Sequence, residues 1–130
     1  MIVVDASAIL AILLEEPDAA LFESHLLQAG GAVISPINHW EVLVRARSVK
    51  GDVGHSEAES LLADLRVGVG EVSAEHSRLA ALAHDRFGRA TPAKLNLGDC
   101  FAYALAATEG DGLLFKGDDF PKTDVKSALI

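Results

Sequence analysis

Cysteine and basic side chains are scarce in this sequence, and each shortage narrows the class of protein. The chain has one cysteine, Cys100, so no disulfide can form within it, which agrees with a reducing compartment. Lys and Arg number 11 against 19 Asp and Glu, and the formal net charge is -8. This charge argues against a protein that holds nucleic acid by covering its phosphates with basic side chains. If the ligand is a polyanion, bound divalent metal is the obvious source of positive charge.

Long apolar runs and a basic start are also missing. The longest apolar stretch near the start, residues 6–14, is well short of the ~20 residues that cross a bilayer, and we interpret it as a buried helix. No Lys or Arg precedes Arg45, so the basic region that a secretory signal needs is absent. We therefore expect a cytoplasmic protein with no membrane association.

The hydrophobic pattern predicts the fold class. Half of the 130 residues are hydrophobic, and the length suits one compact domain over residues 1–130. Short apolar runs predict strands at 2–4, 32–35, 67–72 and 112–115, and longer stretches between them predict helices at 6–14, 17–30, 38–50, 56–66, 73–87 and 97–109. Strands that alternate with helices predict a three-layer α/β domain with a mainly parallel sheet of four to five strands.

Capping residues set several of these helix boundaries. Asn38 is expected to cap the helix over 38–50, with Glu41 three residues later, and Ser56 with Glu59 repeats that pattern. Ser73 is expected to cap the helix that follows the third strand. Glycines are expected just beyond several helix ends, as is usual where a helix stops.

Acidic residues fall where a parallel sheet binds its ligands, beyond the carboxyl ends of the strands. Asp5 directly follows the first strand, and Asp118 and Asp119 follow the fourth by a few residues. Glu41 and Asp99 lie in the first turns of helices that begin near residues 38 and 97. All of these side chains can therefore open onto one edge of the sheet.

Such a cluster of carboxylates predicts a metal site. Carboxylates that lie close together repel one another, and a hard divalent cation removes that penalty. Oxygen ligands suit Mg²⁺ or Mn²⁺, whereas zinc favours His or Cys, and the five histidines show no zinc spacing. A carboxylate site with one or two ions can activate water and stabilise the leaving oxygen of a phosphodiester. The chemistry expected is hydrolysis of nucleic acid without a covalent intermediate.

Each acid also has a purely structural interpretation. Asp5 can cap the helix that follows it, although a carboxylate directly after a buried apolar strand is uncommon. Glu41 has capping-box spacing from Asn38, and Asp99 suits the positive end of a helix dipole. The two acids after the last strand can be turn residues. The prediction of a metal site therefore depends on all of them occurring together.

Four parts of the chain resemble PIN domains, and most closely the VapC toxin group. They are residues 2–8 (IVVDASA), the helix-borne Glu41, residues 97–106 (LGDCFAYALA) and residues 113–120 (LLFKGDDF). The last two are fairly specific to that group, and the order of all four is the family's. The resemblance implies a Mg²⁺- or Mn²⁺-dependent endoribonuclease that acts on RNA. It further implies the toxin half of a toxin-antitoxin pair, usually dimeric and silenced by a VapB-like antitoxin.

The resemblance also assigns roles to single residues. Asp5 and Asp99 match the principal metal ligands, Glu41 matches the third acid, and Ser7 matches a hydroxyl that supports the metal shell.

The fourth acid departs from the family pattern. Many relatives carry an Asp where this chain has Gly117, and here the acids come one and two residues later. We favour Asp119 over Asp118 as the fourth acid, and the shift leaves open whether one or two ions bind.

Several other residues allow two interpretations. Arg86, Arg89 and Lys94 flank the loop before Asp99, where they can guide RNA phosphates or stand as solvated charges. Cys100 falls in an apolar helix and is interpreted as a packed thiol rather than a nucleophile. Trp40 and Phe101 are expected in the core or against a partner rather than as platforms for bases. His39 is expected to point away from Glu41.

Two other functions compete with the nuclease. A degenerate PIN fold would keep antitoxin binding or dimerisation without productive metal geometry, and the shifted acids after Gly117 motivate that hypothesis. A phosphoacceptor receiver-type domain also collects acids at strand ends. That fold needs an Asp after a middle strand, and neither Ser35 nor Val72 supplies one.

Overall fold

The centre of the molecule is a parallel sheet of four short strands. The computed structural model describes residues 1–129, with strands β1 (Ile2–Val4), β2 (Ala32–Ile34), β3 (Val67–Val69) and β4 (Leu113–Leu114). The strand order is β3-β2-β1-β4, and all three pairings are parallel. This confirms the predicted α/β class and the parallel sheet. The order reverses between β1 and β4, and in open parallel sheets ligands bind at such a reversal.

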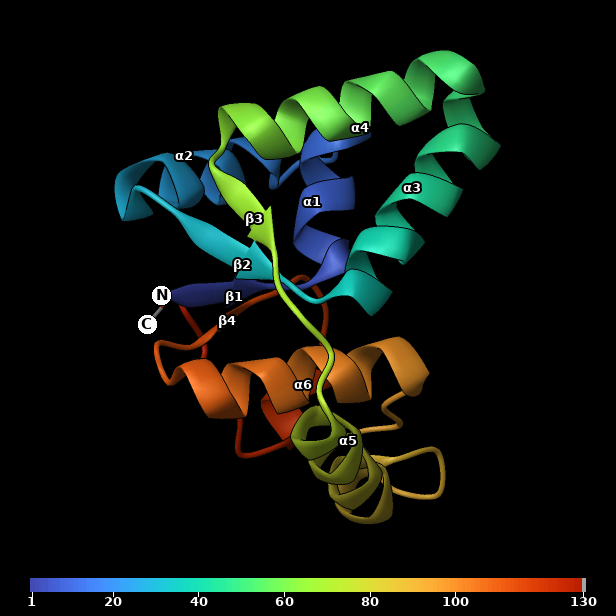
Figure 1. Cartoon of the computed structure of the whole chain (residues 1–130), viewed down its shortest axis with the longest axis vertical. Coiled ribbons are helices and arrows are strands. Elements are labelled where there is room, and N and C mark those ends of the chain that lie inside the picture. Colours follow the sequence, from blue (N-terminus) through green and yellow to red (C-terminus); the bar gives the residue numbers. More distant parts are fainter. Residues whose placement is uncertain (130) are drawn as a thin grey trace.

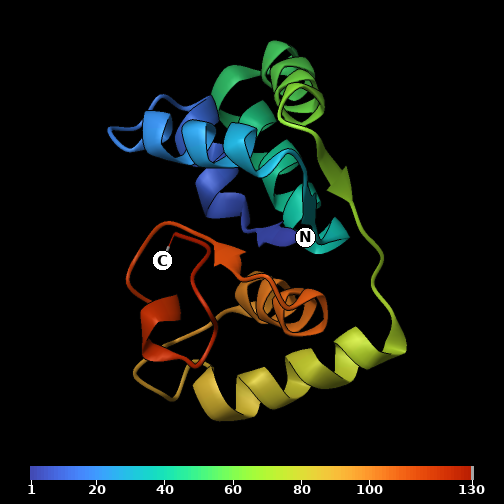
Figure 2. The same ribbon diagram turned by 90° about the vertical axis from the view of Figure 1, so that its left-hand side faces the viewer.

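Helices cover both faces of the sheet. They are α1 (Ala6–Leu13), α2 (Ala19–Ala29), α3 (Pro36–Lys50), α4 (Asp52–Asp64), α5 (Ala74–Phe87) and α6 (Leu97–Glu109), and a short 3₁₀ helix, η1, spans Phe120–Lys122. In Figure 1 and Figure 2, α1 to α4 lie on one side of the sheet, and α5 and α6 lie on the other. The predicted three-layer arrangement is therefore confirmed. No helix within residues 1–129 is long and apolar enough to cross a membrane.

Two apolar cores hold the layers together, one on each face of the sheet. Val4 and Leu114 point into the core shared with α1 to α4, whereas Val3 and Leu113 point into the core shared with α5 and α6. Successive residues of a strand face opposite sides, so an all-apolar strand serves both cores. Cys100 is buried in the second core, which confirms its interpretation as a packed thiol.

The helix α3 begins earlier than predicted. Ser35 is its N-cap, and the Ser35 hydroxyl accepts a hydrogen bond from the Ile37 amide at 3.2 Å, with Pro36 in the first turn. Proline there already has the helical φ and lacks the N–H that would have no partner. The prediction of Asn38 as the cap is therefore wrong. Glu41 consequently lies in the second turn of α3 rather than in the first.

The start of α4 also differs from the prediction. The helix begins at Asp52, so Ser56 lies inside it and does not cap it. Gly51 makes this early start feasible because its φ of 70° lets the chain turn from α3 into α4 without a loop. Two other predicted boundaries are confirmed. Ser73 caps α5 through the His76 amide, and Gly110 ends α6 in the left-handed conformation.

The third strand is shorter than the predicted residues 67–72. Only Val67–Val69 pair with β2, and Gly70 adds a single backbone hydrogen bond to Ile34 O at 2.8 Å. The chain then leaves the sheet and crosses to α5 on the opposite face, as the extended segment in Figure 2 shows.

Candidate functional site

Asp5 directly follows β1 and is the N-cap of α1. Its backbone N–H donates to Leu114 O of β4 at 2.9 Å, which fixes the residue at the reversal of the strand order. Its carboxylate Oδ2 accepts hydrogen bonds from the Ser7 amide at 3.1 Å and from the Ser7 hydroxyl at 2.6 Å. Only 5% of the residue is exposed. Asp5 thus has both the predicted position and a capping role.

Ser7 links the segments that follow the adjacent strands β1 and β4. Its hydroxyl donates to Asp5 and accepts from the Lys116 backbone amide at 2.9 Å, so the turn after β1 is tied to the segment after β4. The side chain of Lys116 turns elsewhere, because its Nζ donates to Glu16 at 2.7 Å and to Asp18 at 3.1 Å. Ser7 is therefore placed to orient the Asp5 carboxylate.

Glu41 is held by a contact between α3 and the start of α6. The buried Asn38 donates through Nδ2 to Glu41 Oε1 at 2.8 Å and to the Gly98 carbonyl at 3.0 Å. Gly98 allows this approach because a Cβ there would lie 2.5 Å from Glu41 Oε2 and 2.6 Å from Glu41 Cδ. His39, in contrast, lies 3.3 Å from Glu59 of α4 and points away from Glu41, as predicted.

Asp99 lies in the first turn of α6 and closes a capping box. Its Oδ2 accepts from the Asn96 amide at 3.0 Å, and Asn96 Oδ1 accepts from the Asp99 amide at 2.9 Å. The structural interpretation of Asp99 is thus correct for one carboxylate oxygen. Among residues 1–129, Asp99 Oδ1 and Glu41 Oε2 accept no hydrogen bond, so each carboxylate keeps one oxygen for another ligand.

The pKa values show that these carboxylates influence one another. Burial, and secondarily the charge of Glu41, raise the pKa of Asp5 to about 6 against the hydrogen bonds from Ser7. Burial also raises the pKa of Asp99 to about 6, with the charges of Asp5 and Asp119 adding to it. The pKa of Glu41 is raised by burial and by Asp99. Carboxylates from β1, α3 and α6 therefore share one electrostatic environment.

The two acids after β4 are not equivalent. Both are exposed, but the charge of Asp119, and not that of Asp118, contributes to the raised pKa of Asp99. Asp119 is thus the acid of this pair whose charge acts on Asp99. Gly117 has a φ of 114°, a backbone conformation that an aspartate there would adopt only with strain.

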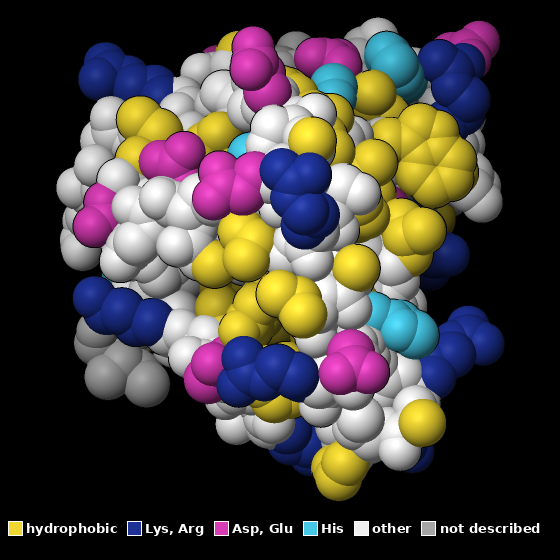
Figure 3. Space-filling model, turned by 60° about the horizontal axis from the view of Figure 1, so that its bottom comes forward, with side chains coloured by type: hydrophobic (Ala, Val, Ile, Leu, Met, Phe, Trp, Pro, Cys, Tyr) yellow, Lys and Arg dark blue, Asp and Glu magenta, His cyan; other side chains and the backbone are white. Residues whose placement is uncertain are grey.

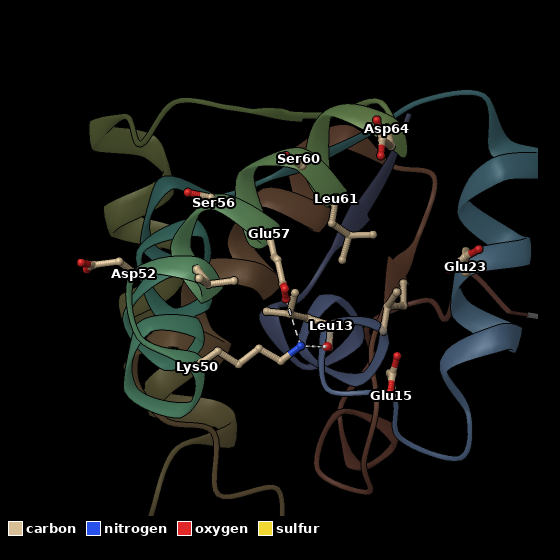
Figure 4. A pocket seen from close by; sticks show the side chains of 12 residues that line it. Leu13, Glu15, Glu23, Lys50, Asp52, Ser56, Glu57, Ser60, Leu61 and Asp64 are labelled. Atoms are coloured by element: carbon tan, nitrogen blue, oxygen red, sulfur yellow. Dashed lines mark hydrogen bonds and ion pairs between the residues drawn. The ribbon is translucent and has the colours of Figure 1, made fainter.

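The three inner acids line a common cavity of about 490 Å³. Its walls come from α1, α3 and α6 and comprise Asp5, Ala6, Ser7, Leu10, Trp40, Glu41, Val44, Arg45, Ser48 and Asp99. A larger cavity of about 800 Å³ lies between α1, α2 and α4, where Lys50 reaches Leu13 and Glu57 (Figure 4). None of the predicted site acids lines that larger cavity.

The carboxylate oxygens of these acids suit a hard divalent cation, but the acids are not arranged around one ion position. Within the described part of the chain, no group of three or more His, Cys, Asp or Glu side chains is arranged to hold a metal ion. Each carboxylate is instead held by a hydrogen bond from Ser7, Asn38 or Asn96, and each raises the pKa of a neighbouring acid. The oxygen-only chemistry and the free oxygens of Glu41 and Asp99 fit Mg²⁺ or Mn²⁺.

The predicted RNA-binding cations do not line this cavity. Arg86 forms an ion pair with Asp124 at 3.2 Å and stacks on the Phe87 ring. Arg89 lines a separate groove between α5 and α6, and Lys94 is exposed in the loop before α6. Figure 3 shows Lys and Arg side chains interspersed with Asp and Glu on the side of the molecule where α5 and α6 lie, without one merged basic patch.

Sequence reasoning missed Asn38 and Gly98 as members of the site. The sequence pattern predicts a capping role for Asn38 and assigns no role to Gly98. The sequence does contain a signal for Gly98. Glycine destabilises a helix, so a glycine in the first turn of an apolar helix indicates close packing at that position. Asn38 had no comparable signal, since its partner Gly98 lies 60 residues away.

Comparison with known protein families identifies the structural class of this chain. The profile of the PIN domain family matches residues 2–126. Ribonuclease VapC of Mycolicibacterium smegmatis is 40% identical over 124 residues, covering 95% of this chain and 96% of the relative. Ribonuclease VapC28 of Mycobacterium tuberculosis is 38% identical, covering 98% and 97%. The chain is a PIN domain, and within that class it belongs to the VapC ribonuclease family.

Solved structures share the fold. The crystal structure of Mycobacterium tuberculosis VapC20, a Sarcin-Ricin loop cleaving toxin, superposes with a TM-score of 0.74 at 18% identity and covers 96% of each chain. A chain of VapBC2 from Rickettsia felis, bound to a DNA fragment from their promoter, gives 0.75 at 16% identity and covers 95% and 94%. At these identities the likeness establishes the fold alone.

Proposed function

We propose that this protein is a Mg²⁺- or Mn²⁺-dependent endoribonuclease and the toxin of a VapBC-type toxin-antitoxin pair. The observation that carries the proposal is the shared environment of Asp5, Glu41 and Asp99 at the reversal of the strand order. The relatives named as VapC ribonucleases support hydrolysis of RNA as the activity.

Four acids are proposed as the metal ligands. Asp5, Glu41, Asp99 and Asp119 would hold the ion, with Ser7 supporting Asp5 and Asp118 lying outside. A bound divalent ion would activate water for attack on a phosphodiester and neutralise the charge that develops on the leaving oxygen. The chain's part is to orient the ligands, because Ser7 fixes Asp5 Oδ2, Asn38 fixes Glu41 Oε1 and Asn96 fixes Asp99 Oδ2.

Partners follow from the same family. The solved relatives include VapBC2 and a toxin-antitoxin complex from Klebsiella pneumoniae with a TM-score of 0.69 at 19% identity. We propose a VapB-like antitoxin as the protein partner, a homodimer as the assembly, RNA as the substrate and the cytoplasm as the location. Arg86, Arg89 and Lys94 remain proposed RNA contacts outside the acidic cavity, and Arg86 would first have to leave Asp124.

A catalytically degenerate binding module is the second candidate. It is favoured by the spacing of the acids, since no three of them within residues 1–129 are arranged to hold an ion. Such a protein would bind an antitoxin without cutting RNA. Its purified form would therefore leave RNA intact at any concentration of Mg²⁺ or Mn²⁺.

The deciding experiment is cleavage of total RNA with the new ends mapped, with and without EDTA. Antitoxin-free protein is expected to cut in Mg²⁺ or Mn²⁺ and to stop in EDTA. Asp5→Asn and Asp99→Asn are expected to abolish cutting, while Asp85→Asn, an exposed acid of α5, serves as the control. Cutting that survives in EDTA or in Asp5→Asn would overturn the proposal.

A further inference from the structure

Trp40 is a large apolar side chain left in solvent beside the acids. It is the only tryptophan of the chain, lies directly before Glu41 on α3 and is 62% exposed. The sequence predicts a place in the core or against a partner, and the exposure of Trp40 excludes the core. A broad aromatic face in solvent is a platform on which another flat group can stack.

The cavity combines this ring with a cation and with the carboxylates. Trp40 and Val44 are one helical turn apart on α3, and Glu41 and Arg45 form the neighbouring row with the same spacing. All four line the cavity of about 490 Å³ that Asp5 and Asp99 also line. The volume lies within the range of ligand-binding pockets. The ring and the guanidinium therefore share a cavity with the acids.

Arg45 is an unpaired cation in an acidic protein. It is exposed and forms no ion pair among residues 1–129, not even with Glu41 one turn away. Arg47 on the same helix pairs with Asp52, and Lys50 pairs with Glu57 at 3.0 Å. An arginine that lines a pocket without a carboxylate partner is available to an anionic ligand.

We propose that Trp40 and Arg45 form a nucleotide subsite in which an unpaired RNA base stacks on the Trp40 ring and a phosphate next to it contacts Arg45. This inference rests on the proposed nuclease function and names its substrate class as single-stranded or looped RNA. In a duplex the bases are stacked on one another, so their faces are closed to the ring, whereas unpaired bases readily stack on aromatic side chains. The bound nucleotide would carry its neighbouring phosphodiester toward Asp5 and Asp99.

A base fits this place better than an apolar face of a protein. An apolar protein surface that covered Trp40 and Arg45 together would bury a guanidinium without a partner, which is strongly unfavourable. A nucleotide satisfies both groups at once because it has a flat base and a negative phosphate. The antitoxin and a second copy of this chain are the other occupants that the experiments below distinguish.

The fluorescence of Trp40 reports whether the subsite is occupied, because Trp40 is the only tryptophan of the chain. The non-cleaving Asp5→Asn protein would be titrated with a short single-stranded RNA, an abasic strand of equal length and a blunt RNA duplex, while tryptophan fluorescence is followed. We expect single-stranded RNA to quench the fluorescence, and the abasic strand and the duplex to leave it nearly unchanged. Equal quenching by the abasic strand would overturn the stacking proposal.

Affinity measurements on variants test the two groups separately. Loss of one base–aromatic stack corresponds to a fall in affinity of roughly 5- to 150-fold for Trp40→Leu, while Trp40→Phe retains most of the affinity. Leu27→Ala, an exposed residue of α2, is the control. Arg45→Gln is expected to reduce the slope of log affinity against log salt by about 0.7, and Arg47→Gln on the same helix is not.

The outcomes separate failure of this inference from failure of the nuclease proposal. Wild-type protein that shows base-dependent quenching but cuts no RNA would refute the nuclease and keep the subsite. Trp40→Leu protein with unchanged RNA affinity and cleavage would refute the subsite and keep the nuclease. Fluorescence that changes with protein concentration alone, or that responds to antitoxin but not to RNA, would assign Trp40 to a protein interface and overturn the proposal.

Discussion

Replacing Gly98 by alanine is expected to displace the Glu41 carboxylate while leaving the fold intact. The added Cβ would lie 2.5 Å from Oε2 and 2.6 Å from Cδ of Glu41, and ordinary contact begins near 3.4 Å. The carboxylate must therefore retreat by about 1 Å, which breaks or lengthens its 2.8 Å hydrogen bond from Asn38. A misplacement of about 1 Å at a reacting centre lowers activity about 100-fold.

The accompanying loss of stability is small. Loss of a hydrogen bond to a charged group lowers the free energy of unfolding by about 1.5–3 kcal/mol. Alanine in place of glycine in a helix raises it by up to about 1 kcal/mol. The net loss for Gly98→Ala is about 1 kcal/mol, or a midpoint about 4 °C lower for a domain of this size. At Gly54, by contrast, a Cβ would meet the Ala46 backbone carbonyl, which cannot rotate away. Gly54→Ala is therefore expected to destabilise more, by about 3 kcal/mol.

Thermal melting and RNA cleavage measured on the same samples test this reasoning. In a Glu41→Ala background, Gly98→Ala should no longer destabilise, because the side chain that it strikes is gone. A double-mutant cycle that gives about 1–2 kcal/mol of coupling is the expected result. Gly98→Ala protein that keeps cleavage within about threefold of wild type would refute the role of this contact.

Three further predictions concern the acids and their supports. In EDTA the raised pKa of Asp5 makes the folded state bind more protons than the unfolded state between about pH 4 and 6, so stability falls as pH rises through that window. Asp5→Asn should thus raise the free energy of unfolding at neutral pH by up to about 2–3 kcal/mol and match wild type below about pH 4; a lower free energy of unfolding at neutral pH contradicts this. Millimolar Mg²⁺ or Mn²⁺ should raise the wild-type midpoint by mass action and leave the Asp5→Asn/Asp99→Asn double variant unchanged, and a flat wild-type midpoint argues against a formed site. Ser7→Ala removes the hydroxyl shared by Asp5 and the Lys116 amide and should reduce stability by about 1–3 kcal/mol, whereas unchanged unfolding in urea would show that the link contributes nothing.

The parts of the fold that local patterns encode were predictable. The run Ile2–Val4 is apolar on both faces because it separates two cores, and the acid that follows it falls at the edge of the sheet. Helix ends set by a glycine, such as Gly110, were also predictable because the left-handed conformation selects that residue.

The parts that depend on competition or distance were not predictable. Asn38 and Ser35 are both acceptable caps, and the cap is Ser35 because Pro36 prepares the first turn. Once Asn38 is inside the helix, its amide can reach Glu41 and the Gly98 carbonyl. That contact arises only when α3 packs on α6, so no local pattern of either helix contains it.

The most direct test of the metal site is a crystal structure with Mn²⁺, located by anomalous scattering. The prediction is a peak between Asp5 and Asp99, with carboxylate oxygens of both residues at about 2.1 Å and Glu41 or Asp119 completing the shell directly or through water. A manganese ion bound elsewhere, or Asp5 and Asp99 too far apart to share one, would contradict the proposed metal site.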